Sequence, residues 1–177
     1  VEEGRGIYDN IVKFVNYLLS ANIAEILIIF LATVFGFKDP EGAPYIPLLP
    51  IHLLWINLVT DGLPAIALGL DPLDARAMQR PPRKSSESIL SARFAAQLIA
   101  IGVVLTTGSL VGCHFGLHQS AALGHTMALT TLVVLELVRI QMIRREYRVG
   151  LFANHWLLLA LASSLLLQLL VIYVPSL

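Results

Sequence analysis

Five long apolar segments, separated by polar stretches, dominate the pattern of the chain. They cover residues 15–37, 48–70, 94–115, 126–143 and 156–174. A helix needs about 20 apolar residues to cross the hydrocarbon core of a bilayer, and each segment is close to that length. A polar, helix-compatible lead at residues 8–14 is expected to continue the first helix outside the membrane. The pattern predicts an all-α, polytopic membrane bundle of about five transmembrane helices.

Basic residues gather in two of the connections between these segments. The connection at 71–93 is the longest and carries Arg76, Arg80, Arg83, Lys84 and Arg93, and the turn after the fourth segment carries Arg144, Arg145 and Arg148. The connection after the first segment has only Lys38, and the neutral loop predicted at 116–125 has no Lys or Arg. Because cytoplasmic loops are enriched in Lys and Arg, we expect a cytoplasmic N-terminus and a C-terminus on the other side.

Composition supports a membrane protein and narrows the chemistry. Hydrophobic residues make up 56% and charged residues 14% of the chain, against about a quarter charged in soluble domains. A formal net charge of zero gives no reason to expect a nucleic-acid partner. The single cysteine, Cys113, excludes an internal disulfide and a cysteine-built metal site.

The second apolar segment carries polar residues near its middle. Asn57, Thr60 and Asp61 have helical i, i+3, i+4 spacing, so their oxygen-bearing side chains are expected to share one face. Gly62 and Pro64 follow; the proline cannot donate to the Thr60 carbonyl, so we expect an unwound helix from Thr60 to Pro64. An ionisable residue inside a spanning helix indicates a functional site because burying its charge is costly.

Two further carboxylates lie in other apolar segments. Asn22 and Glu25 are on the first, and Glu136 is on the fourth. Together with Asp61, the glutamates must share a cation, take up protons or pair with a base. The donor set is oxygen-only, which suits a hard cation such as Ca²⁺ and disfavours copper or zinc. Arg139, at i+3 from Glu136, could either neutralise that carboxylate or extend towards the interface.

Two other readings of these residues stay open. A purely structural bundle would use the polar side chains as hydrogen bonds between helices. A proton- or sodium-driven secondary transporter would also use broken helices and midplane carboxylates, but would predict an internal repeat, and none is visible. The spacing of His114, His118 and His125 is more typical of surface histidines than of a metal motif.

Several stretches of the sequence resemble one family. VEEGRGIYDNIVKFVNYLLSANIAEI, LLWINLVTDGLPAIALGLDP with the following RPPR, TMALTTLVVLELV and LLLQLLVIYVP are similar to the C-terminal membrane region of P-type cation ATPases. The similarity covers essentially the whole chain and is strongest to the calcium-pump subfamily, the sarcoplasmic-reticulum type and its prokaryotic relatives. It implies that residues 1–177 form one membrane domain holding the fifth to ninth of ten helices. Residues 1–14 would be a cytoplasmic stalk, and residues 71–93 a cytoplasmic linker.

The resemblance also implies a set of metal ligands. Asn22, Glu25, Thr60, Asp61 and Glu136 match residues of one calcium site, while Asn57 and Asp61 match contributors to a second. Asp61 would therefore serve both sites. Arg139 departs from the pattern, because calcium pumps place an Asn there, and this puts the contribution of Glu136 and the number of ions carried in question.

The resemblance implies the function of the intact protein. It would be an ATP-driven pump that exports Ca²⁺ from the cytoplasm with proton counter-transport, with a Na⁺ or H⁺ pump as the alternative. ATP and Mg²⁺ would bind cytoplasmic domains outside these residues, so no catalytic residue and no activity of its own are expected here. The expected partners are those phosphorylation, nucleotide-binding and actuator domains, the first four and the last membrane helices, and the bilayer of a prokaryotic plasma membrane.

Overall fold

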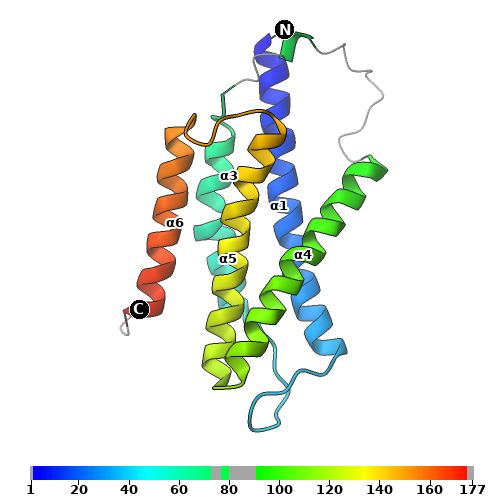
Figure 1. Ribbon diagram of the computed structural model, residues 1–177, viewed down its shortest axis with the longest axis vertical. Coiled ribbons are helices and arrows are strands. Elements are labelled where there is room, and N and C mark those ends of the chain that lie inside the picture. The colour runs from blue at the N-terminus through cyan, green and yellow to red at the C-terminus, as the bar shows by residue number, and fades with distance from the viewer. Residues whose placement is uncertain (1, 73–76, 80–90, 175–177) are drawn as a thin grey trace.

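The computed structural model describes residues 2–72, 77–79 and 91–174, which form an all-helical bundle (Figure 1). The elements are α1 (Glu2–Val34), α2 (Pro50–Trp55), the π-helix η1 (Ile56–Thr60), α3 (Gly62–Leu68), the 3-10 helix η2 (Ala77–Gln79), α4 (Ala92–Leu117), α5 (Ala121–Glu146) and α6 (His155–Tyr173). Because α2, η1 and α3 follow one another, they form one continuous span.

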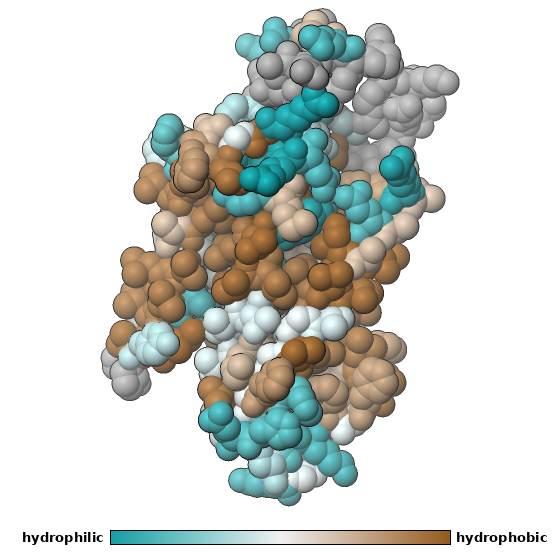
Figure 2. Space-filling model, in the orientation of Figure 1, coloured by the Kyte–Doolittle hydropathy of each residue, from teal (hydrophilic) through white to brown (hydrophobic). Residues whose placement is uncertain are grey.

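The prediction of five membrane-length helices is confirmed. α1, the span Pro50–Leu68, α4, α5 and α6 are each long and apolar enough to cross a membrane. Figure 2 shows apolar side chains across the middle of the bundle and hydrophilic ones at its two ends. The polar lead at 8–14 is part of α1, as predicted, so one helix of 33 residues runs from the end that also holds the α5–α6 turn towards the opposite end.

The predicted loop at 116–125 is wrong, because most of it is helical. α4 continues to Leu117 and α5 begins at Ala121, which leaves a short turn whose Ser120 hydroxyl accepts a hydrogen bond from Leu123 N–H at 3.1 Å. The tight turn is possible because two glycines meet there. A Cβ on Gly116 would lie 2.6 Å from the Leu123 carbonyl oxygen and 2.8 Å from Gly124 Cα.

This close approach gives a stability prediction. Gly116→Ala is expected to destabilise the bundle by about 1–3 kcal/mol, because the added methyl group meets backbone atoms that cannot rotate away. The measurement is thermal unfolding in detergent, followed by helical circular dichroism. Gly4→Ala is the control: nothing lies within 4 Å of its Cβ position, and Ala is preferred to Gly in a helix. Equal melting temperatures for the two variants would contradict the prediction.

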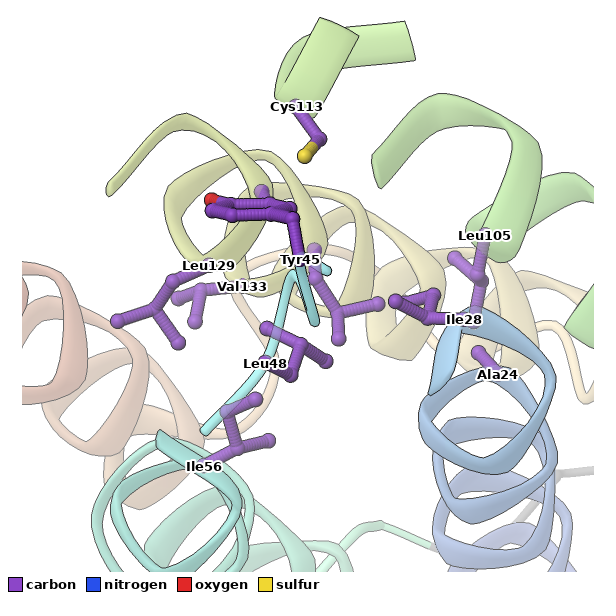
Figure 3. Packing of buried hydrophobic residues seen from close by; sticks show 11 residues of the cluster. Ala24, Ile28, Tyr45, Leu48, Ile56, Leu105, Cys113, Leu129 and Val133 are labelled. Atoms are coloured by element: carbon purple, nitrogen blue, oxygen red, sulfur yellow. The ribbon is translucent and has the colours of Figure 1, made fainter. Parts of the chain in front are cut away.

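An apolar core joins α1, α4, α5 and the connection before α2 at one end of the bundle. Figure 3 shows the Tyr45 ring lying among Leu48, Leu129, Val133 and Cys113, all of them buried members of one hydrophobic cluster. The Tyr45 hydroxyl donates to the Ala121 carbonyl at 3.1 Å. The connection between α1 and α2 is therefore fixed to the start of α5.

At the other end, a buried polar group joins four helical segments; we call it the Asp71 cluster. Its members are Asn10 and Lys13 on α1, Asp71 just after α3, Arg144 on α5, and Asn154 at the start of α6. The Asp71 carboxylate accepts from Lys13 Nζ at 2.8 Å, from Arg144 Nε at 2.9 Å and from Asn154 Nδ2 at 3.1 Å. The Asn10 amide donates to the Asp71 carbonyl at 3.0 Å. One carboxylate thus holds α1, α5 and α6 against the end of α3.

The predicted linker at 71–93 is only partly described. Asp71 and Pro72 belong to the bundle, residues 77–79 form η2, and α4 begins at Ala92 after the N-cap Ser91. Much of the predicted membrane orientation rests on basic residues of this linker. Four of them lie outside the described residues: Arg76, Arg80, Arg83 and Lys84.

Candidate cation site

The span that carries Asp61 changes helix type at its middle. α2 ends at Trp55, residues 56–60 form the π-helix η1, and α3 resumes at Gly62. The Asp61 N–H donates to the Ile56 carbonyl at 2.8 Å, five residues back instead of four. The irregular turn therefore runs from Ile56 to Asp61 and overlaps the predicted segment, Thr60 to Pro64, only at Thr60 and Asp61. Pro64 sits in the first turn of α3, where its missing N–H costs no helical hydrogen bond.

Asn57 and Asp61 differ in burial but both contact α1. The Asn57 amide donates to Glu25, and the Asp61 carboxylate accepts from the Tyr17 hydroxyl. Asn57 is exposed, whereas Asp61 is 1% exposed. The span therefore directs both side chains towards the same neighbouring helix, at different depths.

Helix α6 supports this irregular segment. The Ser164 hydroxyl donates to the Val59 carbonyl at 3.2 Å, and Trp55 Nε1 donates to Gln168 Oε1 at 2.8 Å. Both Ser164 and Gln168 are fully buried. The Val59 carbonyl and the Trp55 indole N–H are thus paired inside the bundle. An apolar side chain on α6 would leave them without partners, so this pairing makes an irregular helix tolerable inside a membrane.

Asp61 and Glu136 face one another in the interior. Asp61 Oδ1 accepts a hydrogen bond from the Tyr17 hydroxyl at 2.8 Å. Asp61 Oδ2 and both carboxylate oxygens of Glu136 are buried, and among the described residues no donor group contacts them. The two carboxyl groups are close enough to share a hydrogen bond when one of them is protonated. The negative charges that act on Glu136 are those of Asp61 and Glu25. Three acceptor oxygens therefore lie ready for a cation or for protons.

Glu25 is the third carboxylate, and it is held by the second span. The Asn57 amide donates to its two oxygens at 3.0 and 3.1 Å and to the Leu53 carbonyl at 2.9 Å. Glu25 is only 6% exposed. This pair joins α1 to η1 beside the pair formed by Asp61 and Glu136, so the three carboxylates come from three helices, as the sequence suggested.

The two remaining predicted ligands, Thr60 and Asn22, have no hydrogen bond to the three carboxylates among the described residues. Thr60 is buried next to Asp61 and donates its hydroxyl hydrogen to the Ile56 carbonyl at 3.1 Å, so its oxygen lone pairs stay available. Asn22 is half-buried on α1 one turn before Glu25. In the described part of the chain, no hydrogen bond joins Asn22 to the other five predicted ligands.

Arg139 turns away from the site. Its guanidinium donates to Asn16 Oδ1 at 3.0 Å and to Glu146 Oε1 at 3.4 Å, both on the side of the Asp71 cluster. None of the ion pairs between described residues joins it to Glu136. Of the two roles considered for Arg139, neutralisation of Glu136 is therefore not the one adopted in this structure.

The carboxylates do not form a closed metal cage in this arrangement. Among the described residues, no three His, Cys, Asp or Glu side chains are close enough together to hold a metal ion. A cation would have to draw on hydroxyl, amide and carbonyl oxygens as well, or bring Glu25 closer to the other two carboxylates. Hard cations accept such mixed oxygen sets.

Tyr17 was missed in the sequence, although it touches the central carboxylate. The signal that could have found it is its position on α1: Tyr17 and Glu25 are eight residues apart, close to two helical turns, and so share a face. Tyr17 is 1% exposed. A buried tyrosine usually finds a partner for its hydroxyl, and Asp61 is that partner.

Comparisons with a family model and with two curated proteins all point to the same family. Residues 45–177 match the family model described as "Cation transporting ATPase, C-terminus". The chain is 37% identical over 183 residues to a calcium-transporting ATPase of Bacillus subtilis strain 168, covering all of this chain and 20% of that protein. It is 34% identical over 198 residues to calcium-transporting ATPase 1 of Bacillus cereus, covering all of this chain and 22% of that protein. The chain thus spans about a fifth of the length of these curated relatives. With its five membrane-length helices, this chain belongs to the cation-transporting P-type ATPases as a C-terminal membrane region.

Proposed function

We propose that this chain is the ion-binding membrane part of an ATP-driven pump that exports Ca²⁺ from the cytoplasm. The observation that carries the proposal is the group of unpartnered, buried carboxylate oxygens of Asp61 and Glu136 beside Glu25. An all-oxygen donor set at membrane depth suits a hard cation. The two relatives are both named calcium-transporting ATPases, which favours Ca²⁺ over Na⁺ or H⁺.

In this proposal the ion is held by the six predicted ligands after a small rearrangement. They are Asn22, Glu25, Asn57, Thr60, Asp61 and Glu136. The Asn57 amide, which donates to Glu25 here, would turn its carbonyl oxygen towards the ion. When the ion leaves, the buried carboxylates cannot all stay ionised without it, so protons replace it. This exchange is the basis of the proposed proton counter-transport.

Helix α1 is suited to transmit the conformational change. It is a single helix of 33 residues, about 50 Å long at the usual rise. It carries both Tyr17, which binds Asp61, and Glu25, which binds Asn57. A tilt of α1 would therefore change both contacts together. The cause of the tilt would be phosphorylation in domains outside this chain, where ATP and Mg²⁺ bind.

The first test uses the intact pump in membrane vesicles. We expect ATP-dependent uptake of radioactive calcium, with the N-terminal end of α1 on the cytoplasmic side of a prokaryotic plasma membrane. ATP hydrolysis that responds to Na⁺ or H⁺ but not to Ca²⁺ would support an ATP-driven pump and contradict Ca²⁺ as the transported ion. Calcium movement driven by an ion gradient without ATP would indicate a secondary transporter and contradict the proposal.

A matched pair of glutamates on α5 tests the site itself. Glu136→Gln is expected to lower the apparent Ca²⁺ affinity of transport by at least about tenfold, because a carboxylate with two free oxygens becomes a neutral amide. Glu146→Gln is the control, since that side chain is 46% exposed and lies outside the site. The measurement is calcium uptake against free Ca²⁺ concentration. Equal affinities in the two variants would show that Glu136 is not a ligand.

A further inference from the structure

Two histidines at the far end of the bundle form a close pair. His114 and His118 are one helical turn apart near the end of α4, and both side chains are exposed. Their Nε2 atoms lie 3.2 Å apart, and the ring centroids are 4.6 Å apart. This pair lies at the turn between α4 and α5, at the opposite end of the bundle from the Asp71 cluster (Figure 1).

The distance between the two nitrogens is the one that a chelated metal needs. A metal ion bound to histidine lies about 2.1 Å from the ring nitrogen. Two such bonds to nitrogens 3.2 Å apart enclose an angle of about 100° at the metal, close to tetrahedral. Histidines four apart on a helix are also the spacing used in helical zinc sites. Without a metal, the two neutral rings can share only one proton between these nitrogens.

A hollow beside the pair offers a third donor. It has a volume of about 300 Å³ and is lined by Phe37, Lys38, Asp39, Pro40, His114, Leu117 and His118. Asp39 Oδ1 accepts from the N–H groups of Glu41 and Ala43 at 3.0 and 2.8 Å, which fixes the carboxylate in place. Lys38 is exposed, so its flexible ammonium group can leave the hollow for solvent.

We propose that His114 and His118 chelate a divalent transition-metal ion, such as Zn²⁺, at this end of the bundle. Asp39, which does not lie close enough to the two histidines for the three to hold a metal ion as they stand, provides the third donor after the exposed histidine side chains turn towards the hollow, and water completes the coordination. Imidazole suits zinc, copper and nickel, whereas the oxygen-only set around Asp61 disfavours them. The two sites therefore select different metals, and this one does not depend on the proposed pump function.

A bound ion would have a mechanical effect. It would fasten the connection that follows α1 to the end of α4, which is joined there to α5 by the Gly116 turn. The C-terminal end of α1 would then be joined to α4 by the ion and to α5 by Tyr45, which already fixes the same connection to the start of α5.

The test is Zn²⁺ binding by the intact protein, purified in detergent without a polyhistidine tag and measured by competition with a chromophoric chelator. We expect one Zn²⁺ per chain. His114→Ala and His118→Ala should each weaken binding by about 100-fold, and Asp39→Asn by about tenfold, in line with the range for changes around metal sites. An excess of Ca²⁺ should not displace the Zn²⁺.

Two controls separate this site from other binding. His155→Ala removes an exposed histidine at the opposite end, and Asp61→Asn removes the central carboxylate of the cation site; both should leave Zn²⁺ affinity unchanged. Wild-type protein that fails to compete for Zn²⁺ would overturn the proposal. Unchanged affinity in His118→Ala would overturn it as well, and unchanged affinity in Asp39→Asn would overturn the three-donor arrangement.

Discussion

Asp61→Asn is expected to abolish ATP-dependent calcium uptake by the intact pump. Asp61 is the carboxylate that accepts from the Tyr17 hydroxyl, and it also lies beside Glu136. The substitution keeps the size of the side chain but removes its charge. It also replaces one acceptor oxygen by an amide donor in a buried site, and a cation cannot use that group.

The measurement is radioactive calcium uptake into vesicles with equal amounts of wild-type and variant protein. Glu41→Gln is the matched control, because it makes the same carboxylate-to-amide change at an exposed position of the connection between α1 and α2. It should transport at the wild-type rate. Normal uptake by Asp61→Asn would show that the site has been assigned wrongly.

Asp71→Ala is expected to lower the free energy of unfolding by about 3–5 kcal/mol, the usual cost of leaving buried partner charges uncompensated. The side chains of Asp71 and Arg144 are 0% exposed, and that of Lys13 is 2% exposed. Removing the carboxylate leaves two buried cations. Within the described part of the chain, the Lys13 ammonium then keeps Asn10 at 3.0 Å and the Tyr147 ring at 5.1 Å.

Thermal unfolding in detergent measures this effect, with two comparisons. Adding Lys13→Met to Asp71→Ala should recover part of the loss, because one of the two unpaired charges is removed with it. Glu41→Ala, the removal of an exposed carboxylate, should change stability by less than about 0.5 kcal/mol. A melting temperature for Asp71→Ala equal to that of Glu41→Ala would refute the stabilising role of the cluster.

The sequence predicted the five spans because membrane helices follow from local composition alone. It placed the end of α1 and the boundary between α4 and α5 less well. Four glycines on the facing sides of α4 and α5 allow close packing with the partner helix: Gly108, Gly112, Gly116 and Gly124. That packing decides how short the turn is, and it depends on contacts between helices that no single segment reveals.

In the candidate site, too, some features could be predicted from the sequence and others depend on contacts between helices. Glu25, Asp61 and Glu136 were predictable because each is a carboxylate in an apolar run. The position of the π-helix was not, because it depends on support from Ser164 on α6. The direction of Arg139 was not predictable either, since it is set by Asn16 on another helix, 123 residues away along the chain. Residue type indicated the chemistry, and tertiary contacts determined its geometry.

The π-helix of residues 56–60 amounts to one extra residue inserted into a regular helix. A relative with one residue fewer in this stretch would keep an apolar helix of membrane length and would read as an intact span. The π turn absorbs that residue, because its residues are spaced by a smaller angle than the roughly 100° per residue of an α-helix. A deletion would therefore turn the π-helix into an α-helical turn and leave α2 and α3 facing as they do now, with Asp61 still towards the Tyr17 hydroxyl. In comparisons across the family, a single gap at this place would mark the loss of the π-helix, with the carboxylate still aimed at α1.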